Sequence, residues 1–137
     1  MPSSPSNRLR ALLGLMPFSE ALGVDLEIAD PGTVVGTLVW SAERCTSDGV
    51  LHGGALMSLA DTVGAICAYL NLPEGTATST IESTTNFFRR VRSGMVRVRA
   101  KPLHVGNRTI VVQTDLQDDQ DRSVALVIST QVVLQRV

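Results

Sequence analysis

The segment between residues 54 and 70 limits the fold more than any other part of this 137-residue chain. It contains no proline, Asn71-Leu72-Pro73 follows it, and no other stretch predicts a helix of comparable length. Apolar residues recur at helical spacing along one side: Leu56, Leu59, Ala60, Val63, Ile66, Cys67 and Leu70. The opposite side is small and apolar with a single acid: Met57, Asp61, Gly64, Ala65 and Ala68. A helix that is apolar on both sides is buried on both sides, so we expect a sheet to cover one and a second subunit or a bound ligand to cover the other.

The rest of the chain favours β-strands separated by turns. Alternating apolar and polar residues predict a hairpin from 24–28 and 34–40, with its turn at Asp30-Pro31-Gly32. After the helix come strand-like runs at 77–88, 95–103, 109–116 and 124–134. Short turns join the last three, which predicts an antiparallel meander. The expected fold class is α+β, with an antiparallel sheet of five to six strands around one long helix.

Composition supports one soluble domain and excludes several classes of protein. Apolar residues make up 44% of the chain and charged residues 18%, which is enough apolar surface for a core and excludes global disorder. No apolar run reaches the roughly 20 residues that span a bilayer, and the first residues lack the pattern of a secretory signal. We therefore expect a cytoplasmic location without membrane insertion. A net charge of −1 gives no reason to expect nucleic acid as a partner.

Basic residues are concentrated in one part of the sequence. Residues 83–114 contain no Asp or Glu but hold seven of the twelve basic side chains: Arg89, Arg90, Arg92, Arg97, Arg99, Lys101 and Arg108. A solvated sheet face accounts for this distribution, and so does a site for an anionic ligand such as a nucleotide-bearing cofactor.

Asp61 is the first candidate for chemistry. It is the only acidic residue between Asp48 and Glu74, and its neighbours on the helix are apolar or small. Desolvating a lone carboxylate is costly unless it is hydrogen-bonded or needed for function. Asp61 is therefore a candidate functional carboxylate, with a structural Asp satisfied by an amide or a hydroxyl as the alternative.

The turn before the helix, His52-Gly53-Gly54, is the second candidate. Unpaired amides at a helix start, aided by the helix dipole, stabilise a developing oxyanion, and glycine allows a carbonyl to come close. His52 would orient the turn or contact the substrate; a glycine turn needed only for chain geometry is the alternative. Gly54 and Asp61 are separated by about 10 Å along one helix, so they cannot act on one carbonyl within a chain. If both act, one subunit supplies the amide and its partner the carboxylate.

These residues together resemble a known family. The run Leu51-His52-Gly53-Gly54-Ala55-Leu56-Met57-Ser58-Leu59-Ala60-Asp61-Thr62, followed by Asn86-Phe87 and by Gly106-Asn107-Arg108-Thr109, resembles the hotdog-fold acyl-CoA thioesterases of the PaaI type. The 4-hydroxybenzoyl-CoA thioesterases belong to the same group. The similarity begins near Pro17, which divides the chain into an N-terminal extension at 1–16, partly helical, and a hotdog domain at 17–137.

The resemblance implies a sheet wrapped around one helix, dimers that pair into tetramers, and hydrolysis of acyl-CoA with no metal or other cofactor. The acid, here Asp61, activates water or attacks directly, and the Gly54 amide polarises the thioester carbonyl. A hydroxyl on the next strand assists; by position this is Thr80, with Ser79 and Ser83 close enough to confuse the alignment.

The remaining expected site residues bind substrate. We expect the pocket to be lined by Gly53, Met57, Gly64, Ala65, Ala68 and Asn86, and the CoA phosphates to meet Arg89, Arg90 and Arg108. Two positions depart from the family pattern. Thr46 stands where many relatives carry Asn, so any assisting role of this side chain would depend on a hydrogen bond from its hydroxyl. Arg90 stands where relatives often have proline.

Other functions fit the sequence less well. A Ser-His-Asp hydrolase lacks the Gly-x-Ser-x-Gly elbow, and Ser58 is expected to point away from Asp61. His52, His104 and the two cysteines lack metal-ligand spacing. A hotdog hydratase or dehydratase that uses a His–acid pair, and a non-catalytic acyl-CoA-binding protein, share the expected fold and stay open.

Overall fold

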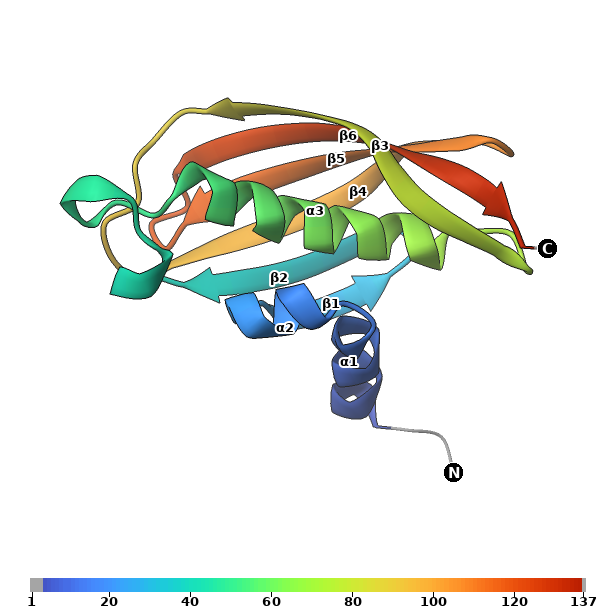
Figure 1. Ribbon diagram of the computed structural model, residues 1–137, viewed down its shortest axis with the longest axis horizontal. Helices are drawn as coiled ribbons and strands as arrows, with labels where there is room; N and C mark the ends of the chain where they lie inside the picture. Colours follow the sequence, from blue (N-terminus) through green and yellow to red (C-terminus); the bar gives the residue numbers. More distant parts are fainter. Residues whose placement is uncertain (1–3, 137) are drawn as a thin grey trace.

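The computed structural model describes residues 4–136 as a curved sheet wrapped around one central helix (Figure 1). The helices are α1 (Pro5–Gly14), α2 (Pro17–Leu22) and α3 (Gly53–Leu70), with short 3₁₀ turns at Ala42–Arg44 and Ser47–Gly49. The strands are β1 (Asp25–Asp30), β2 (Thr33–Val39), β3 (Thr76–Phe87), β4 (Met95–Val105), β5 (Thr109–Asp118) and β6 (Ser123–Gln135). The expected α+β architecture with a six-stranded antiparallel sheet is confirmed.

The six strands lie in the order β1-β2-β4-β5-β6-β3, and every neighbouring pair is antiparallel. The expected hairpin (β1–β2) and meander (β4–β5–β6) are both present. β3 follows α3 in the sequence but pairs with β6, so it forms one edge of the sheet and β1 forms the other. In Figure 1 β3 runs past α3 along its whole length.

The core lies between α3 and the concave face of the sheet. The predicted apolar stripe of α3 is buried except for the half-buried Leu70, and Leu59, Val63 and Cys67 are fully enclosed. Burial of a side chain such as Leu59 stabilises the fold by roughly 1.5–3 kcal/mol. α3 crosses β2 so closely that a Cβ on Gly36 would lie 2.8 Å from Val63 Cγ2. Glycine is therefore required at that crossing.

By length and apolar composition α3 is capable of crossing a membrane, yet more than half of it is buried inside the chain. Its packing against all six strands identifies it as the core helix of this domain. The helix begins one residue earlier than expected, at Gly53, and the side chain of Asn71 caps its last turn by donating to Cys67 O at 2.8 Å.

The two N-terminal helices pack on the side of the β1–β2 hairpin. Ser4 caps α1, and Arg8 Nη2 donates to Ala29 O at 2.8 Å. Pro17 begins α2, and Gly23 ends it with a left-handed φ of 96°. Ser19 and Thr62 share a buried hydroxyl–hydroxyl bond of 2.6 Å, which ties α2 to α3.

The β5–β6 turn depends on a single carboxylate. Asp118 Oδ1 accepts from the amides of Gln120 (2.9 Å) and Arg122 (3.0 Å), and Oδ2 accepts from Arg122 Nε (2.8 Å). Burial alone would raise the pKa of Asp118, but the two backbone donors and the Arg122 guanidinium outweigh it and hold the pKa below its ordinary value. Asp118 is thus a structural carboxylate whose acceptor positions are used within the fold.

Candidate active site

Asp61 lies on the side of α3 that the chain's own sheet leaves open. Its carboxylate is exposed, and Thr80 on β3 donates to Oδ1 at 2.9 Å. The hollow around it has a volume of about 330 Å³ and is lined by Met57, Ser58, Asp61, Thr80 and Ser83. Among the described residues 4–136, Asp61 is the only charged group in that lining. A carboxylate with one hydroxyl donor and an open side retains free lone pairs for a water or a substrate.

A β-bulge in β3 decides which residues face this hollow. Thr80 pairs with Gln131 and Glu82 pairs with Thr130, so Ile81 is the extra residue. The bulge reverses the alternation of side chains, so Ser83 lines the hollow. Glu82 contacts Thr84 and Thr130 instead. The bulge therefore keeps a second carboxylate away from Asp61.

The candidate hydroxyl residues are now distinguished. Thr80 alone bonds Asp61, Ser83 lines the same hollow without that bond, and Ser79 is exposed on the other side of the strand. Ser58 also lines the hollow, so the expectation that it points away from Asp61 was wrong. Its hydroxyl donates to Gly54 O at 2.7 Å, which is no arrangement for a Ser-His-Asp triad.

The glycine turn forms the N-terminus of α3. His52 is the N-cap, and its Nδ1 accepts from Gly54 N at 2.8 Å. The imidazole thus orients the turn. It also accepts the hydrogen bond of the Gly54 N–H, the group that was predicted to polarise a carbonyl. A ligand oxygen at that amide would take the place of the His52 ring. Gly53 lies against Phe87, whose Cζ would be 3.2 Å from a Cβ at that position.

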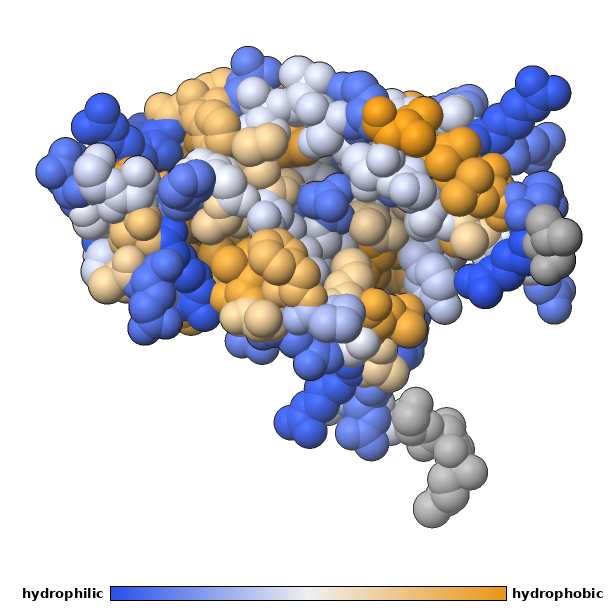
Figure 2. Space-filling view, viewed as in Figure 1, coloured by the Kyte–Doolittle hydropathy of each residue, from blue (hydrophilic) through white to orange (hydrophobic). Residues whose placement is uncertain are grey.

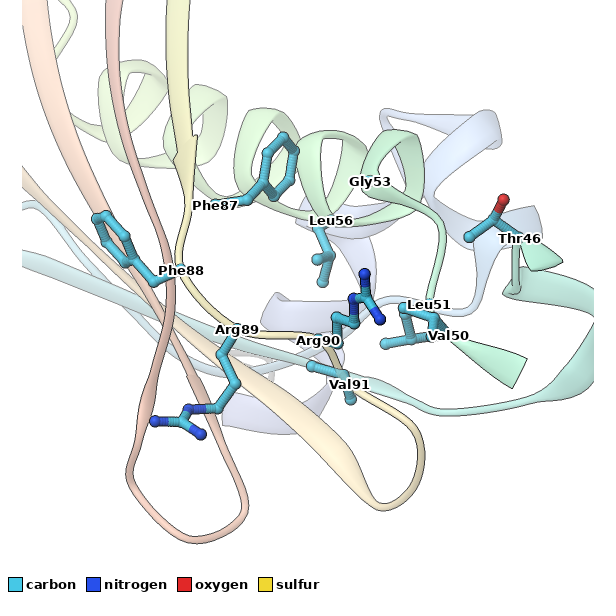
Figure 3. Close-up of a pocket in the computed structure, with 10 residues that line it drawn as sticks. All are labelled: Thr46, Val50, Leu51, Gly53, Leu56, Phe87, Phe88, Arg89, Arg90 and Val91. Carbon is cyan, nitrogen blue, oxygen red and sulfur yellow. The ribbon is translucent and has the colours of Figure 1, made fainter. Parts of the chain in front are cut away.

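A second hollow of about 400 Å³ opens beside this turn (Figure 3). Its walls are Thr46, Val50, Leu51, Gly53, Leu56 and residues 87–91. Thr46 is exposed at the rim. In Figure 3 the Arg90 side chain points between Leu56 and Leu51, whereas Arg89 and Phe88 point away from them. Of the two neighbouring arginines, Arg90 is the one directed into the hollow.

The structure separates several residues that were predicted to act together. Arg108 lies in the turn between β4 and β5, where its backbone carbonyl accepts a hydrogen bond from Val133 N. Arg89 and Arg90 directly follow the last residues of β3, at the opposite end of the sheet. One chain does not bring the three arginines together. Asn86 is exposed and lines neither hollow, since its neighbour Phe87 takes the helix-facing position.

The open stripe of α3 differs in part from the predicted one. Met57 and Asp61 are exposed and Ala65 is half-buried, as expected. The placement of Gly64 and Ala68 on that side was wrong, because both are buried within the chain. A Cβ on Gly64 would lie 3.3 Å from Thr114 Oγ1, on β5. The helix completes its open stripe with Tyr69, a half-exposed residue that the pattern had not singled out.

Metal chemistry and thiol chemistry have little support in the described part of the chain. Among residues 4–136 no three His, Cys, Asp or Glu side chains cluster closely enough to hold a metal ion. Cys67 is fully buried, and burial raises the pKa of its thiol to about 11, which disfavours the nucleophilic thiolate.

Comparison with known proteins places this site in a family. Residues 48–125, which include the glycine turn, Asp61, Thr80 and Asn86, match the thioesterase superfamily. The chain belongs to the thioesterase superfamily. The 1,4-dihydroxy-2-naphthoyl-CoA hydrolase of Escherichia coli (strain K12) is a superfamily relative 38% identical over 101 residues, 74% of each chain.

Other relatives agree with this placement. The protein PM0788 of Pasteurella multocida is 38% identical over 74 residues, so the match covers 54% of this chain and only about half (53%) of that protein. The crystal structure of thioesterase HI1161 from Haemophilus influenzae superposes with a TM-score of 0.87 at 28% identity, over 93% of this chain and 90% of that one. The predicted hotdog fold is confirmed at this level.

Proposed function

We propose that this chain hydrolyses acyl-CoA thioesters as a thioesterase of the PaaI type, with Asp61 as its catalytic carboxylate. The observation that carries the proposal is the Asp61 side chain, held by Thr80 at 2.9 Å in an open hollow of a thioesterase-superfamily fold. The E. coli relative, whose name states an aryl-CoA substrate, supports CoA thioesters as the substrate class.

The chemistry needs one base and one oxyanion donor. Asp61 takes a proton from water, and the hydroxide adds to the thioester carbonyl; direct attack by the carboxylate, followed by hydrolysis of the anhydride, is the second route. The Gly54 amide stabilises the oxyanion after the His52 ring has turned away from it. Collapse of the tetrahedral intermediate breaks the C–S bond. The CoA thiolate leaves and takes up a proton, and the products are the free acid and CoA.

Both groups reach one thioester if two copies of the chain combine. β3 is a 12-residue edge strand with no proline or lysine and one charged residue, Glu82. Ile81 and Phe87 on this strand are half or more exposed. A long edge with a single charged residue favours pairing with another strand. A homodimer in which β3 pairs with the same strand of a second copy would cover this edge and the open stripe of α3.

The contacts of β3 support one register for such a pair. Thr80 touches Asp61, and Phe87 touches Gly53. A two-fold axis between Ser83 and Thr84 places Thr80 opposite Phe87 of the partner subunit. The midpoint of Gly54 and Asp61 on α3 falls at Met57 and Ser58, which lie beside Ser83 in the same hollow. The two-fold axis derived from β3 and the one derived from α3 therefore coincide. A dimer built on this axis would bring each Asp61 hollow next to the glycine turn of the partner subunit.

The second hollow would hold the CoA end of the substrate. Arg90 points into it and Phe87 lines it, so a phosphate and an adenine ring would each find a suitable group there. Figure 2 shows apolar areas interrupted by polar ones on the face that carries α3, as an interface with a polar substrate channel requires. Pairing of two dimers into a tetramer, expected from the family, is part of the proposal.

A thiol-release assay tests the proposed function. Purified protein is incubated with benzoyl-CoA, a dihydroxyaryl-CoA and fatty acyl-CoAs, and free CoA is measured with a thiol reagent. We expect release from at least one aryl-CoA. A change in enoyl absorbance without thiol release would assign a hydratase, and saturable binding without either signal would assign a non-catalytic binder.

A further inference from the structure

The hydrogen bond between Thr80 and Asp61 continues into the core. Gln131 on β6 is fully buried and is the residue that pairs with Thr80 across the two strands. Its Nε2 donates to Thr80 Oγ1 at 2.8 Å. Gln131, Thr80 and Asp61 thus form a continuous chain of polar groups from the interior to the open hollow.

The direction of these hydrogen bonds follows from the number of protons that the Thr80 hydroxyl can donate. The Thr80 hydroxyl has one proton and two acceptors in reach, Asp61 Oδ1 at 2.9 Å and Gln131 Oε1 at 3.1 Å. When Gln131 Nε2 donates to Thr80, the amide fills a lone pair of the hydroxyl and the proton is directed to Asp61. We propose that Gln131 is a positioning residue that fixes the Thr80 proton on Asp61; this rests on the proposed function of Asp61.

A purely structural role for Gln131 is the less economical explanation. A buried amide is costly to desolvate, and an apolar side chain of the same size would avoid that cost. The side-chain partner of Gln131 in the described residues is Thr80, and the bulge that re-aims β3 begins directly after Thr80. In the part of the chain that the structure describes, no other charged side chain lines the hollow, since Glu82 bonds Thr84 and Thr130 on the other side of the strand. Asp61 thus depends on Thr80 for its orientation.

The test replaces Gln131 by a side chain of similar size that makes no hydrogen bond. Gln131→Met removes both the donor and the acceptor of the amide. We expect kcat to fall roughly tenfold for Gln131→Met, with KM unchanged. The acid limb of the kcat/KM profile, which reports the group that must be deprotonated, moves to higher pH.

A double-mutant cycle and a matched control separate positioning from folding. If Gln131 acts through Thr80, Gln131→Met has no further effect in a Thr80→Val background. Ser129→Ala, at another buried polar residue on β6, keeps the wild-type pH profile and controls for general loss of core packing.

The outcomes are distinct. A wild-type pH profile for Gln131→Met, or additive effects in the double-mutant cycle, would overturn the positioning role of Gln131. The proposed function of Asp61 would still stand in that case if Asp61→Asn abolishes activity. Full activity of Asp61→Asn would overturn the proposed function of Asp61 itself.

Discussion

Asp118 lies in the β5–β6 turn and Asp61 on the open side of α3, and the two carboxylates differ in how their lone pairs are used. Asp118 is buried and accepts from two backbone amides and a guanidinium. Asp61 is exposed and accepts from one hydroxyl. A carboxylate surrounded by donors stabilises a turn, whereas one with a single fixed donor is oriented and still free to react. This difference indicates a structural role for Asp118 and supports the proposed catalytic role of Asp61.

Replacing each carboxylate by its amide gives the largest expected contrast. Asp61→Asn should lower kcat for thioester hydrolysis by at least ~100-fold, the scale for loss of a general base. It should leave the Tm unchanged, because the lost interaction is one exposed hydrogen bond. Asp118→Asn is the matched control and should keep kcat. Wild-type turnover by Asp61→Asn would contradict the comparison.

Gly54→Pro removes the N–H group that is the proposed oxyanion donor. Gly54 is the second residue of α3, and proline is tolerated in the first turn of a helix. We expect kcat to fall about 100-fold, the scale measured for one oxyanion donor. Gly54→Ala keeps the amide; its Cβ would lie 2.9 Å from His52 Nδ1, so the flexible ring moves aside and most activity remains. Equal losses in both variants would show that space, and not the amide, matters.

Arg90→Ala tests the second hollow. Loss of one partly exposed contact to a phosphate should raise KM for acyl-CoA about fivefold and leave kcat unchanged. Arg89→Ala is the control, because that side chain points away from the hollow in Figure 3. An acyl-pantetheine thioester, which lacks the nucleotide, should be hydrolysed equally by both variants and by the wild type. A KM effect that persists with this substrate would exclude a contact to the nucleotide.

The smallest expected effect is the pH dependence of the stability that Asp118 contributes. Its folded-state pKa is lowered, so the stability it contributes is present above the unfolded-state pKa and is lost as the pH falls through the folded-state value. The Tm of Asp118→Asn should therefore lie below that of the wild type at pH 7, and the difference should shrink on acidification. Thermal unfolding followed by circular dichroism at several pH values measures it. A difference that grows at low pH would contradict the assignment.

Much of this fold followed from pattern alone. The apolar stripe of α3 and the strand runs are periodic, so the elements, the β1–β2 hairpin and the β4–β5–β6 meander were predictable, whereas the pairing of β3 with β6 was not predicted. The placement of Gly64 failed because the curved sheet covers more of the helix than one stripe, and no helical pattern records how far a sheet wraps. Ser79, Thr80 and Ser83 could not be told apart because the bulge at Ile81 changes the alternation without a sequence signal.

Gln131 was missed for a related reason. It becomes a neighbour of Thr80 only when β6 pairs with β3, a contact between strands that are 51 residues apart in sequence at that point. The one signal in the sequence was a Gln within an otherwise apolar strand. That signal did not indicate which side chain Gln131 would contact. The proposed catalytic residues Asp61 and Gly54 lie in one local motif and were therefore visible in the sequence, whereas Gln131, which contacts Thr80 only in the folded sheet, was not.

Mixing two inactive variants tests the shared site most directly. Asp61→Asn lacks the carboxylate and Gly54→Pro lacks the amide, so a dimer with one copy of each regains one intact site across the two-fold axis. After subunit exchange in equal amounts we expect thiol release at about a quarter of the wild-type rate, because half of the dimers carry one working site of two. A mixture in which exchange is complete, by mass spectrometry of the intact assembly, but which stays as inactive as the separate variants would contradict a site built from two subunits.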